Sequence, residues 1–114
     1  MTDKWASDMP GGVDLSKAKA WIRFSMASSG TINGSYNVKS ITDGGAGLWT
    51  INFGVPFKSA TYAVVGMTAD DSVMGAVTAS VLAGSAKVQV RDNSSSAYDA
   101  TGNYVVFFGE LENE

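Results

Sequence analysis

The sequence predicts an all-β protein: a single β-sandwich, jelly-roll-like or an open barrel, of about seven short antiparallel strands with an extended N-terminal arm. Three observations support this prediction. Short segments with apolar residues at alternate positions recur at close spacing, with turn residues between them. Charged residues make up only 17% of the chain, which suits strands and tight turns better than amphipathic helices. A length of 114 residues fits one ordinary domain.

The N-terminal residues show no periodicity and include "MPGG", which breaks regular structure, so we expect an arm over residues 1–16. The sandwich domain is expected over residues 17–110, and the acidic end of the chain is expected to form a tail over residues 111–114. The first strand is expected within "KAKAWIRFSMA", because apolar residues occupy every second position from Ala20 to Met26.

The next segment, "SSGTINGS", is expected to be a turn, because Asn33-Gly34 is a strong reversal signal. Pro56 in "GVPFKSA" indicates a connection, because proline would interrupt a central ladder. Two later strands are expected to pair around Ala83-Gly84-Ser85. The strands expected after the first are "SYNVKSI" (35–41), "GLWTINF" (47–53), "TYAVVGM" (61–67), "AVTASVL" (76–82), "AKVQVRD" (86–92) and "NYVVFFG" (103–109).

The "DGGAG" segment (residues 43–47) lies between two expected strands and is a candidate for either a ligand-binding loop or a turn. A phosphate-binding loop needs Lys-Ser/Thr or a helix after its glycines, whereas a strand follows here. The glycines allow positive φ angles, and the Asp43 carboxylate suits a hydrogen bond to the backbone of the turn. We therefore expect a hairpin loop.

The composition excludes several classes of function. The net charge is −3 and no basic cluster occurs, which excludes nucleic-acid binding through phosphate neutralisation. Histidine and cysteine are both absent, which removes the commonest general base, thiolate chemistry and nearly all zinc sites. We see no signal peptide and no apolar run long enough to span a bilayer, so we expect synthesis in the host cytoplasm without membrane insertion. No cofactor is expected.

Loop carboxylates remain the only candidates for catalysis or calcium binding, in "TADDS" and "RDNSSSAYD". Both loops are rich in Ser, Asn or Thr, as solvated turns are, and neither has the ligand spacing of an EF-hand. We favour turns and no enzymatic activity. Tyr98 has polar neighbours that suit a contact with a glycan. The candidate outer-loop residues are Asp70, Asp71, Asp92, Asn93, Tyr98 and Asp99.

Two expected strands, "YAVVGM" and "YVVFF", are apolar at consecutive positions, so both of their faces need cover. Either a loop or the arm covers the second face, or another subunit does. We favour a subunit interface, because a chain of 114 residues has little polypeptide to spare. For Trp5 and Trp21, we favour structural packing over contact with a sugar: Trp5 would pin the arm, and Trp21 would pack against a neighbour. The candidate anchor or interface residues are Trp5, Trp21, Tyr62, Val64, Val105 and Phe107.

The segment "KAKAWIRFSMASSGTINGSYNVKSITDGGAGLWTINFGVP", followed by "ATYAVVGM", resembles a β-rich module of tail-fibre and related virion proteins of tailed phages, notably marine and cyanobacterial ones. "VQVRDNSS" is a weaker match, and the similarity covers roughly residues 14–108. The resemblance implies a non-enzymatic virion structural protein, typically a trimer, that contacts other virion proteins. The alternatives are a receptor-binding tip that recognises a host surface glycan, and a capsid decoration protein. The chain lacks a long fibre shaft, which is a departure from this family.

Overall fold

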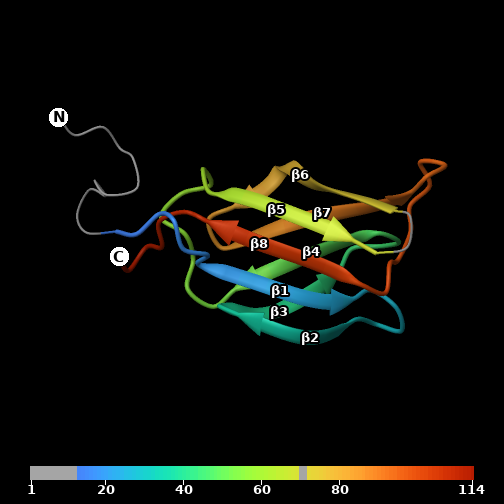
Figure 1. Ribbon diagram of the computed structural model, residues 1–114, viewed down its shortest axis with the longest axis horizontal. Coiled ribbons are helices and arrows are strands. Elements are labelled where there is room, and N and C mark those ends of the chain that lie inside the picture. The colour runs from blue at the N-terminus through green and yellow to red at the C-terminus, as the bar shows by residue number, and fades with distance from the viewer. Residues whose placement is uncertain (1–12, 70–71) are drawn as a thin grey trace.

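The computed structural model describes residues 13–69 and 72–114, and it confirms the predicted all-β sandwich. Two four-stranded sheets pack face to face, and every pairing between strands is antiparallel (Figure 1). Sheet A has the strand order β2-β1-β8-β5, and sheet B, behind it in Figure 1, has the order β3-β4-β7-β6. The strands are β1 (Ala20–Ser25), β2 (Thr31–Tyr36), β3 (Val38–Asp43), β4 (Leu48–Phe53), β5 (Ala63–Thr68), β6 (Ser72–Leu82), β7 (Ser85–Asp92) and β8 (Asn103–Phe108).

The predicted turn at Asn33-Gly34 is wrong, because residues 31–36 form β2 and pair with β1. The chain reverses earlier, at Ser28, Ser29 and Gly30, whose φ angles are +53°, +75° and +83°. Asn33 falls at a register shift in which Arg23 lies opposite Gly34 and the next residue of β1 lies opposite Ile32. The Asn-Gly pair therefore marks a β-bulge, where one strand carries an extra residue.

The single strand predicted over residues 35–41 is divided at Asn37, where the chain passes from sheet A to sheet B. Asn37 has a φ angle of +56°, a conformation that asparagine tolerates better than most residues. Its Nδ2 donates hydrogen bonds to the carbonyl oxygens of Lys19 (3.2 Å) and Val55 (3.0 Å). Its Oδ1 accepts a hydrogen bond from the backbone N–H of Val55 (2.7 Å). The side chain thus supplies hydrogen bonds at the corner, where no ladder continues.

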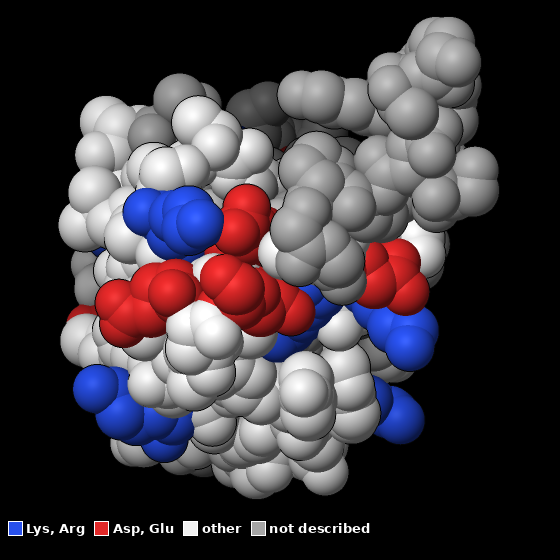
Figure 2. All heavy atoms as spheres, turned by 90° about the vertical axis from the view of Figure 1, so that its left-hand side faces the viewer, with Lys and Arg blue, Asp and Glu red and all other residues white. Residues whose placement is uncertain are grey.

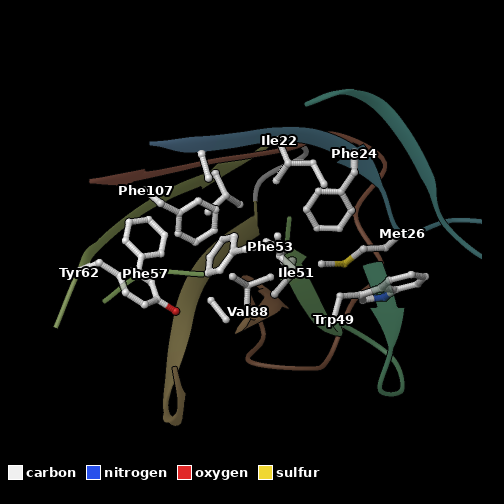
Figure 3. Close-up of a cluster of buried hydrophobic side chains, with 14 of the residues drawn as sticks. Ile22, Phe24, Met26, Trp49, Ile51, Phe53, Phe57, Tyr62, Val88 and Phe107 are labelled. Carbon is white, nitrogen blue, oxygen red and sulfur yellow. The ribbon is translucent and has the colours of Figure 1, made fainter. Parts of the chain in front are cut away.

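Alternating residues of both sheets form the core between them (Figure 3). The predicted alternation in the first strand is confirmed, since Ala20, Ile22 and Phe24 are all buried. At one end of the core, the rings of Phe53, Phe57, Tyr62 and Phe107 pack with centroids between 4.2 and 6.1 Å apart. At the other end, Trp49 packs against Phe24, with ring centroids 6.4 Å apart. The core therefore extends along the length of the sandwich.

Residues near both ends of the chain pack on the sandwich. Val13 and Leu111 are each only 9% exposed, and Leu111 forms an isolated β-bridge with Phe57. The Glu114 carboxylate accepts two hydrogen bonds from Lys19 Nζ, at 2.6 and 2.8 Å. Figure 2 shows this end of the molecule, where acidic and basic side chains lie beside one another. Val13, Leu111 and Glu114 thus contact the sandwich, although the sequence assigned them to an arm and a tail. The rest of the arm, residues 1–12, lies outside the described residues.

Candidate interaction surface

The outer face of sheet A is the surface formed by the side chains that point away from sheet B. In β1, the residues buried in the core leave Trp21 and Arg23 pointing outward. In β8, burial of Asn103, Val105 and Phe107 turns the alternate residues outward. Since paired residues of antiparallel strands share a face, the register of β5 turns Val65 and Met67 outward too. The outward residues of β8 are Tyr104, Val106 and Phe108.

Strand register aligns four apolar side chains across this face, one from each strand. Tyr36 lies opposite Trp21, Trp21 opposite Val106, and Val106 opposite Val65. Three of the four are well exposed: Tyr36 by 56%, Trp21 by 42% and Val65 by 59%. The Trp21 indole lies over Gly34, where a Cβ atom would come within 3.4 Å of the ring. We name these four residues the apolar row.

A second row lies beside the apolar row and contains Gly34, Arg23, Tyr104 and Met67. Met67 is 68% exposed. Arg23 brings a positive charge to these two rows, and its guanidinium lies 5.3 Å from the centroid of the Tyr104 ring, a cation–π geometry. The Arg23 charge therefore lies against an aromatic ring. The other residues of the two rows are apolar or aromatic, and their only polar side-chain groups are the tyrosine hydroxyls.

The outer face of sheet B is polar over β3, β4 and β7, whereas β6 exposes Val73 and Leu82 at its edge. Asn52 Nδ2 donates hydrogen bonds to Ser40 Oγ (3.1 Å) and Thr42 Oγ1 (2.9 Å). Thr50 lies between Thr42 and Lys87 in the register of the same sheet. Polar outer faces of this kind are usual in antiparallel sandwiches, whereas a contiguous exposed apolar patch marks an interaction site. The two faces of this molecule therefore indicate different environments.

The predicted interface residues divide between the core and the surface. Trp21 lies on the outer face of sheet A, and Val64 points inward and is half-buried against the core. Trp5 lies outside the described residues. Three others are core residues, which makes them unsuitable for an external interface: Tyr62, Val105 and Phe107. Burial raises the pKa of Tyr62 to about 12, and its hydroxyl lies within hydrogen-bonding distance of the Leu82 and Ser85 carbonyls, at 2.6 and 2.9 Å.

The predicted loop residues that the structure describes have local structural partners. Asp92 Oδ1 accepts hydrogen bonds from the N–H groups of Ser94 (2.9 Å) and Ser96 (3.0 Å), which closes a turn around the exposed Asn93. Tyr98 is half-buried and packs against the core. Asp70 and Asp71 lie outside the described residues. Within the described ranges, no three acidic side chains gather closely enough to hold a metal ion.

Asp99 connects its loop to the "DGGAG" segment. Its Oδ1 accepts hydrogen bonds from Gly47 N–H (2.7 Å) and Trp49 Nε1 (3.3 Å). Sequence reasoning missed this contact, because the two segments are about fifty residues apart and no local pattern relates them.

The hairpin predicted for "DGGAG" is confirmed, since β3 and β4 pair on either side of it. Gly44 N–H donates to the Leu48 carbonyl (2.7 Å), and Gly45 N–H donates to Asp43 Oδ1 (2.8 Å). Gly47 has a φ angle of +66°, and a Cβ atom there would lie 2.4 Å from the carbonyl oxygen of Val90. The segment is therefore a turn built into the end of the sandwich, and its last glycine permits close packing.

Within the described residues, no helix is long and apolar enough to cross a membrane. Comparison of the chain with protein-family models, with curated proteins and with solved structures gives no match.

Proposed function

We propose that this chain is a non-enzymatic structural protein of a tailed-phage virion, a tail-fibre-type or fibre-associated module that assembles with copies of itself through the outer face of sheet A. The observation that carries the proposal of assembly is the apolar row, which crosses all four strands of an exposed sheet. The resemblance of residues 14–108 to fibre modules supports the location on a virion.

The chemistry of the outer face favours another protein as its partner over a glycan. On the β5 side of the face, Val65 and Val106 have no hydrogen-bonding group, and the Met67 thioether is only a weak acceptor for sugar hydroxyls. Recognition of a polar ligand needs several precisely placed polar groups. Full burial of one Val or Met side chain contributes about 1.5–3 kcal/mol, so a few such residues in an interface suffice for association.

Light scattering over a concentration series tests the assembly of the purified chain. The wild-type protein should form an oligomer, and the resemblance implies a trimer. Trp21→Ser should weaken the oligomer and so lower the molar mass that light scattering measures, because it removes the largest side chain of the apolar row. Leu82→Ser is the matched control, since Leu82 is 55% exposed and lies at the end of β6, in the other sheet. A wild-type chain that stays monomeric at every concentration would contradict the proposal.

The location on a virion needs a separate test. An antibody against the chain should detect it in purified particles of the phage that encodes it. Particles in which neither the antibody nor mass spectrometry detects the chain would exclude a structural role on the virion, whatever its oligomeric state.

A further inference from the structure

The four edge strands of the sandwich differ in how they are protected against pairing with another strand. An edge strand presents unpaired N–H and C=O groups, and proteins usually protect it with charges, proline or a β-bulge. The edge strands here are β2 and β5 in sheet A, and β3 and β6 in sheet B. The pairings of β2, β3 and β6 all contain register shifts, and β3 also carries Lys39 and Asp43.

β5 has none of these protections. Its sequence, AVVGMT, contains no charge and no proline, and its register with β8 is continuous from Ala63 to Thr68. Val65 and Met67 are 59% and 68% exposed, so the strand is also apolar on its outer side. Among the described strands, β5 is thus the edge most open to pairing with an additional strand.

A cavity of about 300 Å³ lies between β5 and β6, which are edge strands of different sheets. Residues 64–66 of β5, residues 74–76 of β6 and Val88 line it, and all of these side chains are apolar or glycine.

We propose that β5 pairs antiparallel with β5 of a second copy of this chain, across a two-fold axis, and joins two A sheets into one eight-stranded sheet. This contact goes beyond the proposed function. It uses the backbone edge of β5, whereas the assembly proposed above uses the side chains on the outer face of sheet A. A two-fold contact brings the same strand of each copy together, so the strand must complement itself. An uncharged strand does so without placing like charges opposite each other.

The alternation of side chains also favours this occupant. Residues paired across antiparallel strands share a face. If the inward residues of one β5 pair with the inward residues of the other β5, then Val65 and Met67 of both copies point outward. The outer faces of the two A sheets then form one continuous surface.

The test separates the edge contact from the face contact by starting from Trp21→Ser, because Trp21 lies on β1, two strands away from β5. Light scattering should show that this variant still forms a dimer. Addition of Val65→Lys should raise the dissociation constant of this dimer at least tenfold, because each copy would place a charge at the pairing edge. Since Val65 also belongs to the apolar row, hydrogen exchange at the β5 amides assigns this effect to the edge. Val73→Lys is the matched control and should leave the dimer intact, since Val73 is 67% exposed on the edge strand β6.

Two measurements keep the proposal testable if Val65→Lys fails to fold. Hydrogen exchange should show that alternate amides of β5 are slower in the dimer than in the diluted monomer. The chain contains no cysteine, so the double variant Val65→Cys/Met67→Cys should form a disulfide-linked dimer under mild oxidation, whereas Val73→Cys should not.

The outcomes distinguish the two contacts. If Trp21→Ser is monomeric, or if the β5 amides exchange equally in both states, the edge contact is overturned while the face contact stands. If Trp21→Ser leaves the assembly unchanged and alternate amides of β5 exchange more slowly in it than in the diluted monomer, the edge contact is supported and the face contact is overturned.

Discussion

Asn37 lies where the chain passes from one sheet to the other. Residues on both sides of it form strands, and the left-handed backbone at Asn37 lets these strands belong to different sheets. Its amide side chain then bonds three backbone groups, of Lys19 and of Val55, that lie in the neighbouring segments. A residue at this corner must both tolerate positive φ and supply a donor and an acceptor, which asparagine does.

The substitution Asn37→Gly separates these two requirements. Glycine keeps the backbone conformation but removes the hydrogen bonds, so we expect the free energy of unfolding to fall by about 1–3 kcal/mol. Ser95→Gly is the control, because Ser95 has a φ angle of +65° and is exposed, and it should change stability by less than about 0.5 kcal/mol. Urea unfolding of both variants measures the difference. Equal stability of Asn37→Gly and wild type would show that the backbone conformation alone forms the corner.

At the scale of the elements, an ion pair joins the C-terminal segment to Lys19, the residue before β1. The Lys19 side chain is only 8% exposed and its Nζ lies 2.6 Å from Glu114, whose side chain is 28% exposed. The hydrogen bond from Lys19 is the main cause that lowers the pKa of Glu114, and the hydrogen bond from the Leu111 N–H adds to it. Burial and the charge of Asp14 oppose this lowering.

The ion pair predicts a pH dependence of stability. Since the pKa of Glu114 is lower in the folded state than its ordinary 4.5, the pair stabilises fully above pH 4.5 and loses this contribution as the pH falls through the folded pKa. Glu114→Gln should cost about 1–2 kcal/mol at neutral pH, less than a fully buried pair would, and the difference from wild type should shrink in acid.

The exposed ion pair between Lys58 and Glu110 provides the control for this prediction. Their side chains are 58% and 34% exposed, so Glu110→Gln should change stability by less than about 1 kcal/mol. Urea unfolding over a pH series measures both variants. A difference between Glu114→Gln and wild type that stays constant through the acid range would contradict the assigned role of Glu114.

Periodicity predicted most strands and failed where it was ambiguous. The first strand, with one apolar and one polar side, was assigned with the correct face inward, because only one face is suited to burial. β5 and β8 are apolar at consecutive positions, so the sequence could not show which residues point inward, and Val105 and Phe107 were assigned to an interface. β2 was missed because Asn33-Gly34 is a turn signal that here lies in a bulge.

At the scale of the whole molecule, the sandwich presents two unlike outer surfaces. The sequence indicated that two strands lack a polar side, but the apolar row depends on the register of four strands that are far apart along the chain. No local pattern encodes such a register. Three pairings together align the row: β1 with β2, β1 with β8, and β8 with β5.

The contrast between Trp49 and Trp21 provides a direct measurement of assembly. Trp49 is 1% exposed in the core, whereas Trp21 is 42% exposed on the outer face of sheet A. If the outer face is buried by assembly, iodide should quench tryptophan fluorescence more strongly in dilute than in concentrated protein, because only dilution exposes Trp21. Trp21→Phe should remove this concentration dependence, since it leaves the other tryptophans in place. Equal quenching of the wild-type protein at all concentrations would show that Trp21 remains in water and that assembly uses another surface.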